Sequence, residues 1–175
     1  MNIFYLHDDP VICAKYHSDK HVVKMILETT QLLYTCLWIT LDNNWQDVAP
    51  LTKTGKRGYK QTHKNHPSAI WVRESIQNYH WLCDLGIALC TEYTYRYNKI
   101  HACYEHLQWL KDQKPNIPNI EKTQIKLAMP QPYKTKCPIS SYREYYIHEK
   151  RTICRWTRRE IPEWFKNGLI THSLV

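Results

Sequence analysis

A stretch without glycine or proline runs from Asp19 to Trp38 and constrains the fold more than any other part of the chain. Ser18 and Asp19 are both residue types that cap the N-terminus of a helix. When the following side chains are placed at helical spacing, apolar residues cover roughly two thirds of the circumference. The stretch therefore predicts one long helix that other elements bury on most of its sides.

The polar side of this predicted helix is a narrow stripe of mixed chemistry. Its members recur every three or four residues and therefore project along one line. They are His21, Lys24, Glu28, Gln31 and Thr35. An imidazole, an ammonium group, a carboxylate and an amide in reach of one another can bind and exchange protons when they share a cleft. The stripe is thus either a candidate active site or an ordinary packed or solvated helix face.

The rest of the chain predicts further helices. Residues 67–97 keep helical spacing, and they follow Asn65-His66, with Pro67 in the first turn, where its missing N–H costs nothing. A shorter helix is expected over 101–111. We therefore expect a mainly α, compact, single-domain bundle over residues 1–175, with a long buried N-terminal helix and little or no sheet.

Two segments near the C-terminus have distinct compositions. Five of the nine prolines lie between Pro115 and Pro138, which predicts an extended Pro-rich connector over 115–138. Ser141-Tyr142-Arg143-Glu144 fits a capping box that would open a basic C-terminal helix over 141–159. On such a helix Arg151, Arg155 and Arg158 would align on one face, where they suit successive phosphates.

Charge and aromatic content favour a nucleic-acid partner. The chain has 24 Lys and Arg against 16 Asp and Glu, a formal charge of +8 and a pI near 9.1, with 13 Tyr and 7 Trp but only 2 Phe. Cations neutralise phosphates, and Tyr and Trp can stack on bases. The alternative is a basic enzyme with a tyrosine-rich core, since net charge constrains partners only loosely.

Residues 42–66 form a predicted basic loop, which contains no acidic residue from Lys53 to His66. Its cations alternate with rings, a pattern expected of a loop that touches a phosphate backbone, although a solvated surface loop would look similar. The DNA-contact candidates from this region are Lys56, Arg57, Lys60, Lys64 and His66, with Arg73 on the next helix.

Other features limit the chemistry and the compartment. The seven cysteines are odd in number and contain no C-x-x-C pair, which indicates reduced, buried thiols rather than disulfides. No secretory signal is recognised and no apolar run approaches 18 residues, so we expect an intracellular protein without a membrane partner.

No common cofactor motif is present, and we expect no cofactor and no metal site. His63 and His66 leave open a metal-dependent nuclease or nucleotide hydrolase.

Four short segments, in order, resemble the phage-type pyrimidine-dimer DNA glycosylases with abasic-site lyase activity, the endonuclease V type. Asp19-x-His21 with Glu28 seven residues after His21 resembles the first helix of that family. Asn65-His66-Pro67-Ser68 is similar to the turn that opens its second long helix. Met129-Pro130-Gln131-Pro132-Tyr133 resembles a later connector, and Ile161-Pro162-Glu163-Trp164-Phe165 resembles its aromatic tail.

The resemblance implies base excision from damaged or modified pyrimidines in duplex DNA by a monomeric, viral-type enzyme in the cytoplasm or nucleus of a host cell. An amine would attack C1′ of the sugar and displace the base, and Glu28 would then assist proton transfer and strand scission. His21 would help to hold the site or the phosphate, and Lys20 would contact DNA.

The nucleophile is open at this stage. An α-amine is better suited than an unperturbed lysine, because its pKa lies near neutrality. Asn2 is a poor second residue for removal of the initiator methionine, and Leu27 stands where the family has an arginine beside the glutamate. The candidates for the amine are therefore Met1, Asn2 and Lys24, the last if burial lowers its pKa. A non-catalytic nucleic-acid-binding module is the alternative from a different class.

Overall fold

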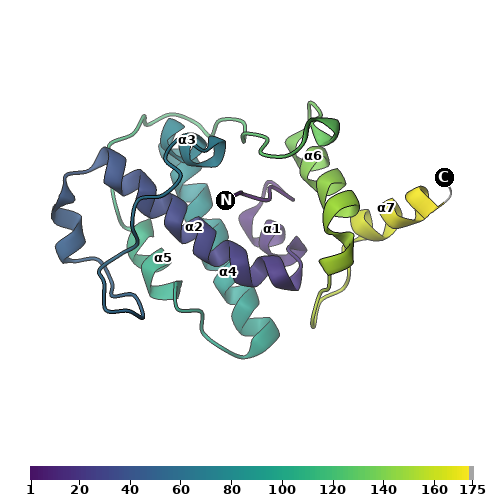
Figure 1. Cartoon of the computed structure of the whole chain (residues 1–175), viewed down its shortest axis with the longest axis horizontal. Coiled ribbons are helices and arrows are strands. Elements are labelled where there is room, and N and C mark those ends of the chain that lie inside the picture. The colour runs from purple at the N-terminus through teal and green to yellow at the C-terminus, as the bar shows by residue number, and fades with distance from the viewer. Residues whose placement is uncertain (174–175) are drawn as a thin grey trace.

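The computed structural model describes residues 1–173 and shows a mainly α protein (Figure 1). Its α-helices are α1 (Pro10–Tyr16), α2 (Asp19–Thr40), α3 (Pro67–Glu74), α4 (Ile76–Tyr97), α5 (Tyr104–Lys111), α6 (Pro138–Tyr145) and α7 (Glu163–Ser173). Within the described residues, the β pairing consists of one isolated bridge between Leu51 and Arg57. The predicted fold class is confirmed.

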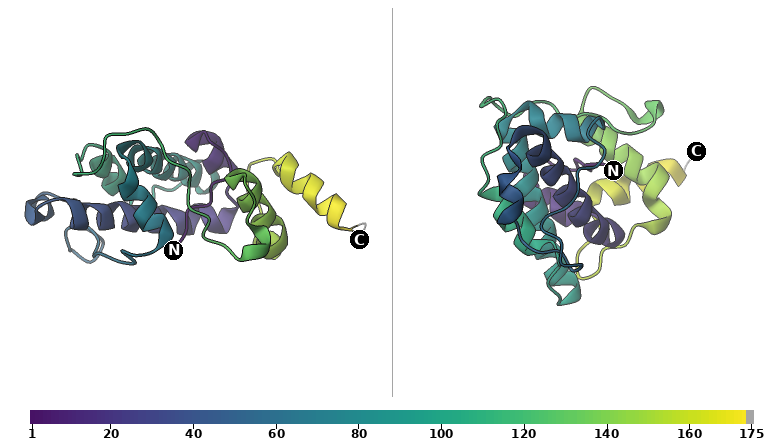
Figure 2. Two further views of the ribbon diagram at one scale, coloured as in Figure 1. Left: turned by 90° about the horizontal axis from the view of Figure 1, so that it is seen from above. Right: turned by 60° about the vertical axis from the view of Figure 1, so that its left-hand side comes forward.

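Helix α2 forms the centre of the bundle, as predicted. It packs against α3, α4 and α5, and Figure 2 (left) shows α4 and α5 on one side of it and the N-terminus on the other. By length and composition α2 would also qualify as a membrane span, but 67% of its most apolar window is buried inside the protein. The polar residues of the stripe interrupt the apolar run in α2, and the average hydropathy of this segment is high because it is the core helix of the bundle.

The predicted helix over 67–97 is two helices, divided at Ser75. Ser75 is extended, with φ −154° and ψ 144°, and its Oγ accepts from Gln77 N at 3.0 Å, which caps α4. The same hydroxyl donates to Ile120 O at 2.6 Å, and Ile76 N donates to Pro118 O at 2.9 Å. The break exists because the 115–138 connector supplies partners for the backbone and hydroxyl at this point.

The prediction of a basic helix over 141–159 is wrong in both the start and the length of the helix. Helix α6 begins at Pro138, and Ser141 Oγ accepts from Thr135 N at 2.8 Å rather than capping a helix. After α6 come a π-helical turn (Tyr146–Lys150) and a 3₁₀ turn (Arg151–Ile153), and then the chain leaves helical geometry. The three arginines therefore do not share a helix face.

The cause of this early end is a long-range attachment at the N-terminus of α2. Asp19 N donates to Arg155 O at 2.8 Å, while the Asp19 carboxylate accepts from Thr157 N at 2.9 Å and from Thr157 Oγ1 at 2.7 Å. Arg158 then takes a left-handed conformation with φ 57°. These bonds need an extended chain over residues 155–157, which a continuing helix would not supply.

The basic loop and the connector lie on different parts of the bundle. The loop opens with a 3₁₀ turn (Asn43–Asp47) and turns back at Gly58, where φ is 62° and an added Cβ would come within 2.8 Å of the Tyr34 ring. The connector is extended, as predicted, apart from the 3₁₀ turn Gln131–Tyr133. Ahead of α1, residues 3–6 form an extended arm that is buried in the core.

Candidate active site

The start of the chain lies against Glu28 in the middle of α2. Asn2 N donates to Glu28 Oε2 at 3.0 Å, and the amino group of Met1 lies 3.7 Å from the same oxygen. The Glu28 side chain is 12% exposed, so the carboxylate is screened from most of the solvent but open at one side. This arrangement brings a carboxylate and an α-amine within reach of one reacting atom.

The connector and α6 hold Asn2 in place. Its side-chain nitrogen donates to Ala128 O at 2.9 Å, and its Oδ1 accepts from Ile3 N at 2.8 Å. Tyr142 Oη lies 3.1 Å from Asn2 Oδ1 and 3.0 Å from Lys126 O, and the Tyr142 side chain is fully buried. Because each bond comes from a different element, the N-terminal arm has one well-defined position beside Glu28.

His21 lies on the same stripe but faces the interior. Its ring stacks on Phe4 with centroids 4.4 Å apart, and Nδ1 lies 2.5 Å from Tyr146 Oη. Burial lowers the pKa of His21 to about 3, and the charges of His17, Lys150 and Lys24 add to the effect. His21 is therefore neutral near pH 7.

The tautomer of His21 follows from its partner. Ser18 N donates to the Tyr146 oxygen at 3.5 Å, and we assign the phenol hydrogen to the bond with Nδ1 of His21. A neutral imidazole that accepts at Nδ1 carries its proton on Nε2. His21 can thus donate one hydrogen bond and cannot contribute a positive charge.

Lys24 lies at the open side of the site. Its Nζ is 3.2 Å from Glu28 Oε1, and its side chain is 67% exposed. A nucleophilic lysine of the kind that burial creates would be enclosed by the protein, and the Lys24 side chain is not. Lys24 is better placed to contact a phosphate next to the site.

His66 borders the site from the start of α3. Its Nδ1 accepts from Ser68 N at 3.1 Å and caps that helix. Burial lowers the pKa of His66, the N-terminal amino group and His63 lower it further, and the charge of Glu28 acts in the opposite direction. His66 is thus close enough to the N-terminal amine and to Glu28 for their charges to act on it. In the sequence these three groups are up to 65 residues apart.

A basic hollow of about 600 Å³ lies along α2 next to the site. It is bordered by Gln31 of the polar stripe, by Lys53, Lys56 and Lys60 of the basic loop, and by Tyr59. Figure 2 (left) shows the loop and the N-terminus on the same side of α2. The predicted loop cations and the polar stripe therefore share one face of the protein.

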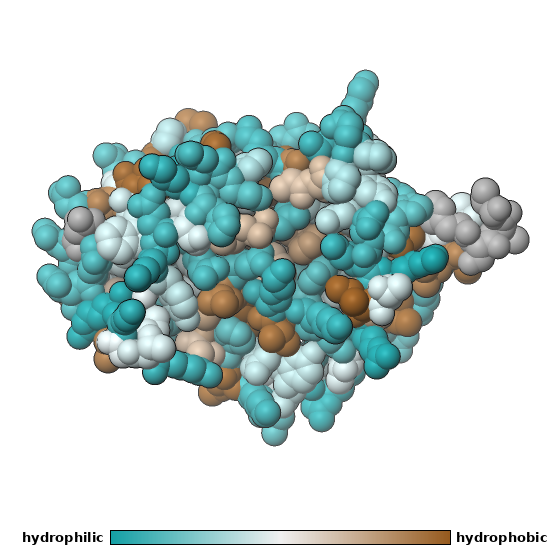
Figure 3. Space-filling view, in the orientation of Figure 1, coloured by the Kyte–Doolittle hydropathy of each residue, from teal (hydrophilic) through white to brown (hydrophobic). Residues whose placement is uncertain are grey.

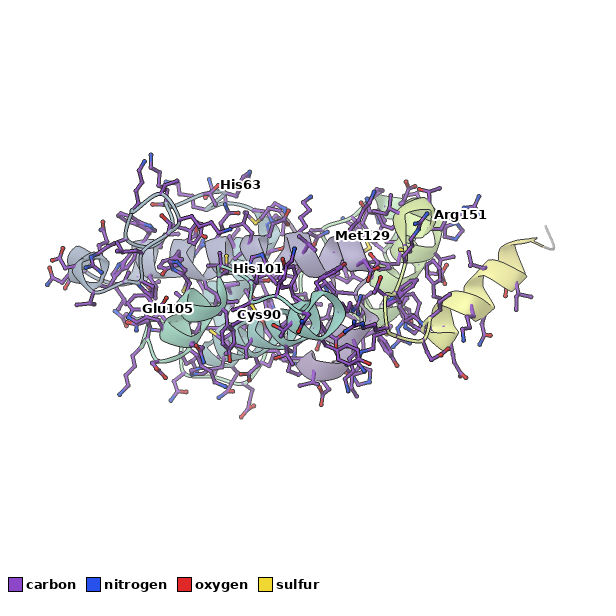
Figure 4. All side chains as sticks on the ribbon, turned by 90° about the horizontal axis from the view of Figure 1, so that it is seen from below. His63, Cys90, His101, Glu105, Met129 and Arg151 are labelled. Atoms are coloured by element: carbon purple, nitrogen blue, oxygen red, sulfur yellow. The ribbon has the colours of Figure 1, made fainter. Side chains whose placement is uncertain are left out.

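The other predicted DNA contacts fall into two groups, exposed side chains and side chains that bond to backbone carbonyls. Lys20, Lys64, Arg151 and Arg155 are exposed. Figure 4 shows His63 and Arg151 on the same side of the molecule, at opposite ends of α2, so the two basic regions flank the site.

Three arginines are instead bonded to backbone carbonyls. Arg57 donates to Ala49 O at 2.8 Å, and Arg158 donates to Tyr95 O at 3.2 Å. Arg73 donates to Ala69 O at 2.9 Å and to Lys64 O at 2.9 Å. These bonds stabilise turns, and they leave fewer donors for phosphates than the sequence suggests.

A metal site has little support in the described part of the chain. Among residues 1–173, no group of three or more His, Cys, Asp or Glu side chains converges in a way that could hold an ion. His63 Nδ1 lies 2.5 Å from Thr62 Oγ1, and His66 Nδ1 is used to cap α3. The two histidines thus lack a third ligand.

A comparison with family models identifies the chain. Residues 1–111 match the model of the pyrimidine dimer DNA glycosylases, a segment that contains Glu28, His21, Lys24 and the N-terminal arm. The chain belongs to the pyrimidine dimer DNA glycosylase family. Neither the curated proteins nor the solved structures gave a significant match. The family is one of DNA-repair glycosylases, so DNA is its substrate.

Several residues around the site were not predicted as functional from the sequence. Tyr142, Tyr146 and Phe4 position the N-terminal arm and His21, and the first two lie beyond the family match. Their contacts with the site span 140, 125 and 17 positions respectively, and no spacing rule connects residues so far apart. The only sequence signal is that they are aromatic residues in a basic, tyrosine-rich chain.

Proposed function

We propose that this glycosylase is a bifunctional enzyme that excises a damaged or modified pyrimidine from duplex DNA and then cleaves the strand at the abasic site. The observation that carries the proposal is the position of the chain's first backbone nitrogens against Glu28, at 3.0 and 3.7 Å from Oε2. A glycosylase that uses water needs no amine at that position, whereas a lyase does.

The amine begins the reaction at C1′ of the target nucleotide. Its nitrogen forms a bond to C1′, the C1′–N bond to the base breaks, and the base leaves with the electron pair and takes up a proton. Loss of the second amine proton and opening of the sugar ring give an imine between the protein and C1′. An α-amine suits this step better than a lysine side chain, because its ordinary pKa of about 7.7–8.0 is lower than the value near 10.4 of lysine.

Glu28 supports the proton transfers that follow. As a carboxylate beside the amine it can accept a proton from the nitrogen and return it to the O4′ oxygen as the ring opens. Removal of a C2′ proton from the imine then expels the 3′ phosphate by β-elimination, which cleaves the strand. Hydrolysis of the imine returns the amine to its starting state.

The identity of the amine depends on N-terminal processing. With Met1 present, its amino group is the nucleophile, and its side chain is 3% exposed beside the site. With Met1 removed, the Asn2 nitrogen becomes the amine, already 3.0 Å from Glu28. Lys24 is the third candidate, and its exposed position makes it the weakest of the three.

The rest of the proposal concerns the partner and the setting. We infer that the protein acts as a monomer and a single domain on duplex DNA inside a cell, with phosphates held by Lys20, Lys24, Lys56, Lys60, Lys64, Arg151 and Arg155. The non-catalytic binding module remains the alternative from another class, and in that case Glu28→Gln would change no activity because none would exist.

Borohydride trapping tests the proposal directly. The protein is mixed with duplexes that carry an ultraviolet lesion, an abasic site or no damage, and borohydride reduces any imine to a stable covalent adduct. We expect an adduct on damaged and abasic DNA with the wild-type protein and with Lys24→Gln. An extension of a few residues before Met1 should abolish it. Cleavage without any trapped adduct would overturn the amine mechanism, and an adduct lost only in Lys24→Gln would assign the reaction to that lysine.

A further inference from the structure

Two exposed apolar side chains lie on α2 among the exposed lysines Lys20 and Lys24. Leu27 is 38% exposed and Val23 is 42% exposed, although both belong to the central helix of the bundle. Neither packs against the hydrophobic core, whereas Met25, Ile26 and Leu32 of the same helix are 3% exposed or less. These two apolar side chains are therefore left uncovered in the N-terminal half of a helix whose other apolar residues there are buried.

The neighbours of Leu27 are cationic and polar. Lys24 precedes it by three residues and Gln31 follows it by four, so both lie beside it on the helix surface, and Lys20 lies one turn beyond Lys24. Lys20 and Lys24 are exposed, and Gln31 borders the basic hollow. Figure 3 shows isolated hydrophobic groups among hydrophilic ones over α2 on this face. An apolar pair surrounded in this way fits a partner that is anionic at its edge and apolar inside.

Duplex DNA has this distribution of chemistry, with phosphates outside and base faces inside the stack. Leucine and other apolar side chains serve as wedges that enter between base pairs and unstack them. Glu28 follows Leu27 directly in the sequence. The proposed reaction beside Glu28 requires that the N-terminal amine can reach the sugar of the target nucleotide. An unstacked step beside the target would make the sugar accessible.

We propose that Leu27, supported by Val23, inserts into the duplex at the base step next to the target nucleotide and opens it for attack. This inference rests on the proposed function, because it needs the target sugar to reach Glu28. Leu27 is a positioning residue in this role and takes no part in proton transfer. The lysines around it bring the duplex onto the helix, and the leucine separates the bases.

The test uses a duplex with a tetrahydrofuran abasic analogue, which cannot form an imine, and 2-aminopurine as the adjacent base. Fluorescence of 2-aminopurine rises when the base loses its stacking partner. Wild-type protein and Leu27→Met should raise the fluorescence at saturation. Leu27→Ala should give a clearly smaller rise and about tenfold weaker binding, since one buried apolar side chain is lost.

Two controls separate a wedge from a general loss of binding. Ile39→Ala removes an apolar side chain of similar exposure, 42%, near the other end of α2, and should behave as wild type. The slope of log K against log salt concentration should be the same for Leu27→Ala and wild type, because no phosphate contact is removed. A Leu27→Ala protein that raises fluorescence to the wild-type level at saturation would overturn the wedge.

The same measurements keep this inference distinct from the proposed function. If wild-type protein binds the duplex in a salt-dependent way and cleaves abasic DNA but leaves 2-aminopurine stacked, only the wedge is overturned. If wild-type protein shows no salt-dependent binding and no trapped adduct, the proposed function fails and the wedge fails with it.

Discussion

The backbone nitrogen of Asn2 and the carboxylate of Glu28 are joined by a hydrogen bond of 3.0 Å across 26 residues of sequence. This bond places the beginning of the chain at the middle of the central helix α2. The N-terminal arm covers part of the polar stripe of α2, because Phe4 stacks on His21 and Asn2 bonds Glu28, whereas Thr62 of the basic loop covers Thr35.

Removal of the Glu28 charge should separate catalysis from binding. In Glu28→Gln the amide oxygen still accepts from Asn2 N, so the arm should stay in place. Strand cleavage at an abasic site should fall by about 10²–10⁴-fold in single-turnover kinetics, because the proton acceptor is lost. The affinity for the same duplex should change only a few-fold. Glu105→Gln, in the exposed face of α5 (Figure 4), is the matched control and should cleave at the wild-type rate.

Loss of one hydroxyl in α6 should displace the N-terminal arm. Tyr142→Phe removes the one hydrogen that the hydroxyl can share between Asn2 Oδ1 and Lys126 O, and it also removes the oxygen that accepts from Ala128 N. The free energy of unfolding should fall by about 1–2 kcal/mol. Cleavage should fall by about 10–100-fold, because small displacements of reacting groups are costly.

A buried tyrosine elsewhere provides the comparison for Tyr142. Tyr79 Oη donates to Leu110 O at 2.7 Å between α4 and α5, away from the N-terminal arm. Tyr79→Phe should lower the free energy of unfolding by a similar amount in urea titrations and leave cleavage by the folded protein unchanged. Equal losses of activity in both variants would show that Tyr142 acts only through stability.

The basic loop should account for part of the salt dependence of binding. Lys56→Ala and Lys60→Ala should each weaken affinity for any duplex sequence and reduce the slope of log K against log salt concentration by about 0.9. Lys99→Ala, which removes an exposed lysine just after α4, should leave the slope unchanged. Unchanged slopes in both loop variants would place the DNA on another face.

Acid should destabilise the protein through two buried histidines. Burial lowers the pKa of His21 to about 3 and that of His17 to about 4. The unfolded chain, with histidine pKa values near 6.5, then binds more protons than the folded one below pH 6.5, so stability falls as the pH falls from 6.5 towards 4. Each histidine should cost about 2 kcal/mol between pH 7 and 5.

Urea unfolding at several pH values checks this assignment. His21→Asn should reduce the dependence between pH 6.5 and 5 by about half, because His17 remains, whereas His148→Asn, at an exposed position, should retain it. A His21→Asn protein with the full wild-type pH dependence would show that other groups cause the acid sensitivity.

Periodicity was sufficient to predict the central helix and its polar stripe, because both depend on residues three or four positions apart. It failed at Ser75 and after Tyr145, where the backbone is held by Ile120 and Asp19 from distant parts of the chain. Glu92 also has one contact that helical spacing predicts and one that it does not. Its pairing with Arg96 follows from helical spacing, but the second contact, from Arg159 at 2.6 Å, does not.

The sequence was sufficient to predict the proposed reacting groups of the candidate site, but not the residues that hold those groups in place. Glu28 and the N-terminal amine follow from the family resemblance, and the structure brings them together. The residues that hold Asn2 are a carbonyl of the connector and a tyrosine of α6, at positions 128 and 142. A backbone carbonyl has no sequence signature, so this part of the site could only be found in three dimensions.

The bonds between Asn2 and Tyr142 also set an order of events during synthesis. The ribosome releases residue 2 early, but its partner is made 140 residues later, and Thr157 reaches Asp19 later still. Contacts between such distant positions form late in folding, after local helices have formed. A nascent chain would therefore lack the bond that fixes Asn2 to α6 until translation is nearly complete.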